Sequence, residues 1–169
     1  IIQEFNGELY CVYSNQKVYK FNSGNDGFGS ALDTLPAVAT DALQARMGGT
    51  LYLIIAHTGG YTYTSDASSF TDDTTDAKFL TFWDDKLWGI DNTGQMWYSS
   101  SIGTEVNDAK LPLPNGHVTD LFVARNASGN PVIYAMTKEG LYAHDFSNNK
   151  FVETQLALPF HNENGKGSV

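Results

Sequence analysis

The chain has 169 residues, of which 41% are hydrophobic, 13% aromatic and only 17% charged, and its formal net charge is −9. This length suits a single domain with one sizeable core. An acidic chain with two arginines lacks the basic surface that nucleic-acid phosphates require, and anionic membranes are disfavoured for the same reason. No apolar run of about 18 residues is present, so we expect no insertion into a membrane by a helix.

An aromatic-led hairpin phrase occurs four times along the chain. In chain order the copies are Leu9–Phe21, Leu51–Tyr63, Leu87–Tyr98 and Ile133–His144. Their first aromatic residues, Tyr10, Tyr52, Trp88 and Tyr134, are 42, 36 and 46 residues apart. Repeats of about 40 residues with strand-like content are typical of propeller blades.

The first two units contain short strands separated by glycine turns. The first unit begins with a predicted strand over Ile2–Phe5 and a turn at Asn6 and Gly7. The second unit predicts strands over Asp41–Arg46, Leu51–Ala56 and Tyr61–Thr64. Thr40–Met47 is the stretch that could form a helix, but the repeat register outranks local propensity and predicts a strand there.

The last two units follow the same plan. In the third unit, the predicted strands cover Lys78–Trp83, Leu87–Asp91 and Met96–Ser99, with a faint fourth strand around Glu105–Lys110. The fourth unit is the clearest, and its predicted strands cover Val118–Arg125, Pro131–Thr137, Leu141–Asp145 and Lys150–Leu156. The alternation of apolar and polar residues in the last of these indicates a half-buried outer strand.

We therefore predict an all-β fold, a β-propeller of four four-stranded antiparallel blades in a single domain, 1–169. The blades are expected at about 1–36, 37–76, 77–115 and 116–159, and 160–169 would lead into a further blade or close the ring. A closed four-bladed ring and a partial arc of a larger propeller both fit the repeats. A closed ring has no bare sheet edges, whereas an arc would leave its first and last blades partly bare. An arc would therefore favour self-association.

One turn carries a resemblance to a known group of propellers. Asn92–Trp97 (NTGQMW) resembles the Asp-box of sialidase-like and sortilin-like propellers, in which Asp or Asn, a following Gly and an aromatic residue hold a hairpin. Ile90 stands where the motif has Ser or Thr, and the other three units lack the motif. The resemblance implies the β-propeller superfamily and a structural turn. Sialidase chemistry would also require three arginines, and the chain has two.

Two acidic segments are candidates for chemistry. Asp84, Asp85 and Asp91 flank a hairpin with Trp83, Trp88 and Trp97 and could supply the carboxylate pair of a glycosidase. Asp84 and Asp85 in an ordinary tight turn are the simpler interpretation. Thr71–Asp76 (TDDTTD) has the clustered oxygens of a calcium loop without the EF-hand spacing, so an acidic connection between blades is favoured. We predict no catalytic residues, no metal site and no cofactor.

Turns offer a different kind of candidate site. In an up-and-down blade, the turn between the second and third strands lies on the same rim as the segment that leads into the first strand. Turns on such a rim can vary without disturbing the sheets. The candidate ligand-binding residues on this rim are His57, Asp91, Asn92, His117, Lys138 and Glu139, and the candidates for stacking on a sugar are Trp83 and Trp88.

The favoured function is a non-enzymatic propeller module for protein interaction or structural assembly, as part of a larger extracellular, surface or virion-associated protein. Cys11 is the only cysteine, which excludes an internal disulfide. A carbohydrate-binding propeller and a fragment of a glycoside-hydrolase propeller are the alternatives. The expected partner is thus a protein or a glycan.

Overall fold

The computed structural model describes residues 1–112 and 118–154, and within these residues all regular structure is β-strand. Sixteen strands in this part of the chain form four separate sheets, and each sheet contains four antiparallel strands. Every sheet follows the chain order of its strands, so each is a simple up-and-down meander. The predicted all-β fold with four four-stranded blades is confirmed.

The sixteen strands are divided among four blades in chain order. Blades 1 and 2 consist of β1 (Ile2–Phe5), β2 (Glu8–Val12), β3 (Lys17–Asn22), β4 (Gly27–Thr34), β5 (Ala39–Met47), β6 (Thr50–His57), β7 (Gly60–Thr64) and β8 (Thr71–Asp73). Blades 3 and 4 consist of β9 (Phe79–Trp83), β10 (Lys86–Ile90), β11 (Gln95–Ser99), β12 (Val106–Lys110), β13 (Val118–Arg125), β14 (Pro131–Thr137), β15 (Leu141–Asp145) and β16 (Lys150–Glu153).

Most predicted strands lie within a residue or two of the observed ones, and the stretch over Thr40–Met47 is a strand, as the repeat register predicts. The expectation of an acidic connection over Thr71–Asp76 is wrong for its first half. Thr71–Asp73 forms β8, which pairs with β7 and completes blade 2. The last two residues of the strand predicted over Lys150–Leu156, and the segment 160–169, lie outside the described residues. No helix in the described part could span a membrane.

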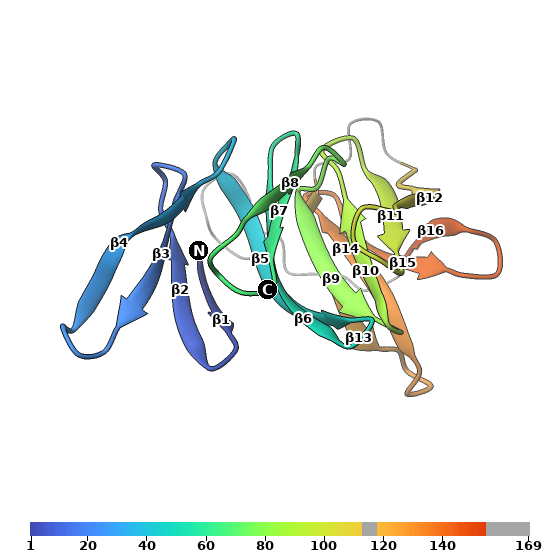
Figure 1. Ribbon diagram of the computed structural model, residues 1–169. Coiled ribbons are helices and arrows are strands. Elements are labelled where there is room, and N and C mark those ends of the chain that lie inside the picture. Colours follow the sequence, from blue (N-terminus) through green and yellow to red (C-terminus); the bar gives the residue numbers. More distant parts are fainter. Residues whose placement is uncertain (113–117, 155–169) are drawn as a thin grey trace, which may run out of the picture.

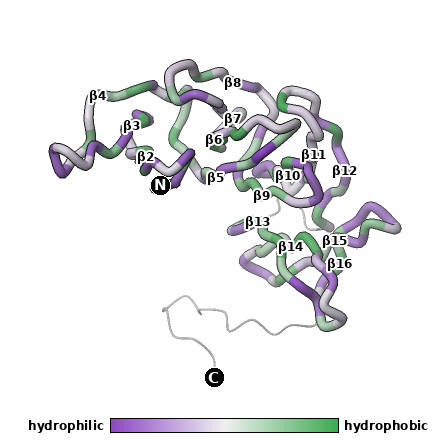
Figure 2. Tube along the Cα trace, turned by 60° about the horizontal axis from the view of Figure 1, so that its bottom comes forward, coloured by the Kyte–Doolittle hydropathy of each residue, from purple (hydrophilic) through white to green (hydrophobic). Residues whose placement is uncertain are grey.

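The four blades lie side by side along an arc (Figures 1 and 2). Their first strands are neighbours, because β1 contacts β5, β5 contacts β9 and β9 contacts β13. Blades 1 and 4 stand at opposite ends of this arc, and no comparable packing joins β1 to β13 within the described residues. The sequence is compatible with a closed ring and with an arc, and the described blades form an arc.

Three hydrophobic cores lie between successive blades in the described part of the chain. Core I joins blades 1 and 2, and its buried residues are Phe5, Tyr10, Val12, Val18, Leu35, Leu53 and Ile55. Core II joins blades 2 and 3 and includes Ala45, Met47, Ile54, Tyr61, Leu80, Leu87 and Trp97. Core III joins blades 3 and 4 and includes Trp88, Ile90, Met96, Val118, Leu121, Ile133, Tyr142 and Phe151.

In the two middle blades, β6, β10 and β11 each contribute to two of these cores, because successive side chains of a strand point to opposite faces. Met96 and Trp97 are neighbours in β11, yet Met96 belongs to core III and Trp97 to core II. We call the face toward the following blade the forward face, and the face toward the preceding blade the backward face. Burial of each large apolar side chain stabilises the fold by about 1.5–3 kcal/mol, so pairing of these faces is the main stabilising term.

Trp97 is the largest side chain in core II and connects blades 2 and 3. Only 2% of its surface is exposed, and its ring stacks on Tyr61 with the centroids 5.7 Å apart. Its Nε1 donates a hydrogen bond to the carbonyl oxygen of Asp76 at 2.9 Å. The indole also lies against Gly89, where an added Cβ would be 2.2 Å from Cζ2 of Trp97. Gly89 is therefore required by packing rather than by its backbone conformation.

We predict that Gly89→Ala lowers the free energy of unfolding by about 1–3 kcal/mol or more, because Trp97 must move out of its packed position. Urea denaturation followed by tryptophan fluorescence measures the change. Gly29→Ala is the matched control, since a Cβ at Gly29 meets no atom within 4 Å. Equal stability of the two variants would contradict the role assigned to Gly89.

Candidate functional site

The predicted rim residues lie on several blades and do not converge on one point. Asn92, Lys138 and Glu139 are exposed in the turns that follow β10 and β14, and Asp91 is half-buried. His117 lies outside the described residues. Within the described part, no three side chains among His, Cys, Asp and Glu are grouped so that they could hold a metal ion. The rim candidates therefore stay a prediction.

His57 is a buried structural residue. Its exposed fraction is 2%, and Nε2 lies 3.0 Å from Oγ1 of Thr62, while Nδ1 lies 3.3 Å from the carbonyl oxygen of Thr58. The Thr62 hydroxyl donates in turn to Oδ1 of Asp72 at 2.5 Å. These contacts connect the end of β6 to β7 and β8. Both ring nitrogens of His57 face protein oxygens, which leaves neither of them open to a ligand.

At one place, the turn after the second strand of a blade contacts the segment that leads into the next blade, as expected for up-and-down blades. The backbone N–H of Gly59, in the turn between β6 and β7, donates to Oδ1 of Asp76 at 3.0 Å. Asp76 belongs to the segment that leads into blade 3. A turn of one blade and the lead-in of the next thus meet, and the contact is another link between blades 2 and 3.

The turn that resembles an Asp-box is held by Asp91 rather than by Asn92. Oδ1 of Asp91 accepts hydrogen bonds from the backbone N–H groups of Thr93 at 2.7 Å and Gln95 at 2.8 Å. Gly94 has a φ of 82°, the left-handed conformation that this turn requires. Asn126 makes the same pair of bonds in blade 4, so the arrangement is a general turn of this chain and supplies no chemistry.

Asp84 and Asp85 form a tight hairpin turn, as the simpler interpretation of the sequence predicts. Their φ angles are 53° and 54°, which is the pattern of a type I′ turn between β9 and β10. Asp84 lies 3.9 Å from the ammonium group of Lys86. The position of the pair is thus explained by the hairpin alone.

The two tryptophans considered for sugar stacking differ in exposure. Trp88 is 3% exposed, and its Nε1 donates to the carbonyl oxygen of Trp83 at 3.1 Å, so Trp88 offers no free ring face. Trp83 is half-buried and packs against Phe146, which is 41% exposed, with their ring centroids 5.2 Å apart. Together Trp83 and Phe146 form a small aromatic surface where blades 3 and 4 meet.

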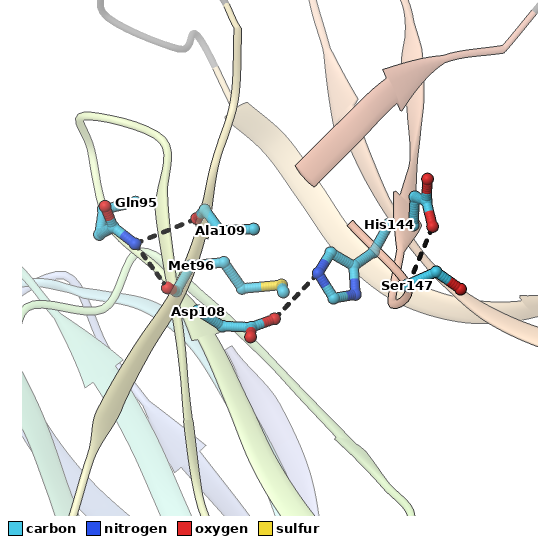
Figure 3. Close-up of polar contacts among 7 residues, drawn as sticks. Gln95, Met96, Asp108, Ala109, His144 and Ser147 are labelled. Carbon is cyan, nitrogen blue, oxygen red and sulfur yellow. Dashed lines mark hydrogen bonds and ion pairs between the residues drawn. The ribbon is translucent and has the colours of Figure 1, made fainter. Parts of the chain in front are cut away.

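A buried pair of polar side chains that the sequence did not predict joins blades 3 and 4. Figure 3 shows Asp108 of β12 and His144 of β15 pointing toward one another, with Oδ2 and Nε2 2.9 Å apart. Their side chains are 9% and 0% exposed. The geometry at the two atoms does not meet that of a directed hydrogen bond.

Aromatic rings enclose His144. The imidazole centroid lies 6.1 Å from that of Trp88, 4.3 Å from that of Phe146 and 5.5 Å from that of Phe151. Burial lowers the pKa of His144 below its ordinary value, and this effect outweighs the attraction of Asp108, which acts to raise the pKa. We therefore describe His144 as neutral near pH 7.

The Asp108–His144 pair does not form a catalytic triad within the described residues. Neither ring nitrogen of His144 has a hydrogen-bond partner there, so no hydroxyl group is in place to act as a nucleophile. The repeat register indicates the direction in which His144 points. Its counterparts on the third strands of the other blades are Phe21, Thr64 and Ser99, and their side chains all point toward the preceding blade. Nothing in the sequence pattern, however, identifies Asp108 as the residue opposite His144.

The backward face of blade 1 is an uncovered apolar surface. The apolar side chains on this face are Ile2, Leu9, Cys11, Tyr13, Tyr19, Phe21 and Phe28, and the exposed Glu4 lies beside Leu9 on the same face. Ile2 is 65% exposed, Tyr13 46% and Leu9 39%. Tyr13 meets Tyr19 and Phe28 edge-on, with centroids 5.3 and 5.9 Å away. In blades 2, 3 and 4 the matching face is packed in a core.

The forward face of blade 4 is the corresponding surface at the other end of the arc. Its apolar side chains on the four strands are Phe122, Ala124, Val132, Tyr134, Met136, Leu141, Ala143 and Val152, and Asp120 and Asp145 lie on the same face. Val152 is 44% exposed, whereas Tyr134 is 8% and Leu141 is 6% exposed. Phe122 stacks on Tyr134 with a centroid separation of 5.8 Å. Both ends of the arc therefore carry apolar side chains of the kind that forms the internal cores, and those of blade 4 are less exposed than those of blade 1.

Comparison with known proteins shows the fold and no family. No family model matches the chain, and no curated protein is significantly similar to it. A computationally designed protein, Ika8, is similar over 90% of this chain and 47% of its own, with a TM-score of 0.63 and 12% identity.

Two further solved structures are similar to the chain. The extracellular domain of a protein assigned as a hybrid two component system from B. thetaiotaomicron matches 96% of this chain and 22% of its own, with a TM-score of 0.67 and 16% identity. KlHsv2 with a replaced loop matches 86% of this chain and 48% of its own, with a TM-score of 0.52 and 12% identity. The chain thus spans less than half the length of each of these structures.

The lowered pKa of His144 predicts an acid-sensitive fold. Because the unfolded chain takes up a proton near the ordinary histidine pKa of about 6.5 and the folded chain does so only at lower pH, stability falls as the pH drops below that value. Urea midpoints at about pH 7.5 and about pH 5 measure the loss. His144→Gln should show a smaller loss than the wild type, and an unchanged pH dependence would contradict the assignment.

Proposed function

We propose that the chain is a non-enzymatic propeller module for protein interaction or structural assembly, and that its binding surface is an end of the arc. The backward face of blade 1 carries this proposal. Exposed contiguous apolar surface of this kind marks binding sites in folded proteins. The face continues the set of surfaces that already pair inside the molecule, so its chemistry suits another protein surface better than a small polar ligand.

The polar features support the same proposal. His57, Asp76 and the Asp108–His144 pair all bond within or between blades and are committed to the structure. We assign the Asp-box-like turn at Asn92–Trp97 a structural role and no catalytic role. One similar structure is an extracellular domain, and its likeness supports an extracellular or surface setting as part of the proposal.

A carbohydrate-binding propeller is the second candidate, and the surface formed by Trp83 and Phe146 is the observation that favours it. Sugar rings stack on exposed aromatic faces, and these two side chains are partly exposed side by side. The surface is small and has no group of polar side chains assigned to it, so it ranks below the end face of blade 1.

The proposed function predicts that a charge on the backward face of blade 1 weakens binding there. Leu9→Glu and Tyr13→Glu should lower fluorescence of the dye anilinonaphthalene sulfonate and abolish any association seen by sedimentation, because each places a carboxylate on the apolar surface. Val38→Glu is the control, since Val38 is 49% exposed and lies before β5. A wild-type protein that neither binds the dye nor associates would contradict the proposal.

A glycan array tests the second candidate. If the Trp83 surface binds sugars, the wild type should bind a set of glycans, and Trp83→Ala should reduce that binding by about twofold to tenfold, since stacking on one aromatic ring contributes about 0.5–1.5 kcal/mol. Phe79→Ala is unsuitable as a control because Phe79 packs against core III, so Val38→Ala serves instead. Absence of binding to every glycan would remove this candidate.

A further inference from the structure

We propose that a second copy of this chain packs head to tail against the end of the arc. This proposal rests on the proposed assembly function. The forward face of blade 4 in one copy packs against the backward face of blade 1 in the other. The contact would form a fourth core of the same kind as cores I, II and III, built from two chains.

The internal cores define which surfaces are complementary. In core I, forward-facing Val12 of blade 1 belongs to the same cluster as backward-facing Leu53 of blade 2. In core III, forward-facing Met96 of blade 3 belongs to the same cluster as backward-facing Leu121 of blade 4. Every internal interface thus pairs a forward face with a backward face. Within the described residues, blade 4 has the unpaired forward face that blade 1 requires.

A hydrogen bond between the first strands of blades 2 and 3 shows how neighbouring blades are aligned. Asp41 lies in β5, opposite Ala56 and just after a break in the pairing with β6. Its Oδ1 accepts from the backbone N–H of Ala42, and its Oδ2 accepts from the backbone N–H of Leu80, both at 2.8 Å. The second bond crosses from blade 2 to blade 3, so one carboxylate fixes the position of the following blade.

Asp120 repeats the first half of this arrangement in blade 4. It lies in β13, opposite Met136 and just after the equivalent break in pairing with β14. Its Oδ1 accepts from the backbone N–H of Leu121 at 2.8 Å, as Asp41 does from Ala42. Oδ2 of Asp120 makes no hydrogen bond to another described residue. The counterpart of Leu80 would have to come from a blade that follows blade 4.

Ile2 is the residue of blade 1 that corresponds to Leu80. Ile2 is paired with Cys11 on the second strand, just as Leu80 is paired with Gly89. Ile1 and Val12 exchange both backbone hydrogen bonds at 2.9 Å, so the N–H of the next residue, Ile2, points away from β2. The Ile2 N–H of a second copy is therefore the donor that Oδ2 of Asp120 lacks.

Pairing of unlike faces also determines what kind of assembly results. A contact between two identical faces would stop at a dimer with one two-fold axis, whereas a head-to-tail contact repeats and either closes into a ring or extends into a filament. Both products contain the same contact between Asp120 and Ile2. The mass of the assembly distinguishes the products, and a cross-link between the two positions identifies the contact.

Cross-linking between two singly labelled proteins tests the arrangement. In a Cys11→Ala background, one protein carries Ile2→Cys and the other Asp120→Cys, and a short bismaleimide is added to each alone and to the mixture. We expect a covalent dimer in the mixture and none in either protein alone or in Cys11→Ala. A dimer formed by Ile2→Cys alone would mean that two backward faces meet, and it would overturn the proposal.

Sedimentation equilibrium of the unmodified chain is the second measurement. We expect a mass of at least twice the 18.5 kDa of one chain, and a dissociation constant about tenfold weaker for Asp120→Ala but unchanged for the control Glu139→Ala. A wild-type monomer at concentrations up to about 1 mM would overturn the second copy as the occupant. Dye binding by that monomer would still support the proposed function, so the two failures are distinguishable.

Discussion

The packing of one blade face on another is the interaction on which the rest of this structure depends. A four-stranded meander is a thin layer with apolar side chains on both sides, and it cannot bury either side by itself. Trp97 shows how closely neighbouring blades fit, since its ring contacts Gly89 of its own sheet and stacks on Tyr61 of the preceding one. Stability therefore resides between the blades, and the number of interfaces matters more than the number of strands.

This constraint explains the use of the polar residues. Asp41, Asp76, Lys78 and His144 all reach an adjacent blade: Lys78 Nζ donates to the carbonyl oxygen of Val118 at 2.7 Å, and His144 lies against Asp108. Each residue has a type that is also found in active sites, yet each satisfies a partner across an interface. The same constraint makes the ends of the arc the natural place for binding, because the apolar faces there have no described blade beside them.

The sequence predicts the fold well because its signals are local. The repeated aromatic phrase marks the central hairpin of every blade, and the repeat register correctly makes Ala39–Met47 a strand. It does not predict β8, whose three polar residues pair with β7 and have no apolar alternation. The Asp108–His144 pair and the bond from Asp41 to Leu80 are also missed, because each joins strands of different blades and no spacing along the chain encodes it.

Hydrogen exchange on blade 1, measured at low and high protein concentration, tests the central claim that its backward face lacks a neighbour in the isolated chain. In dilute solution, the amides of β2 and β3 should exchange faster than those of β6 and β10, whose blades are packed on both sides. They should become protected as the concentration rises. Equal protection of blade 1 and the inner blades in a dilute monomer would contradict the account.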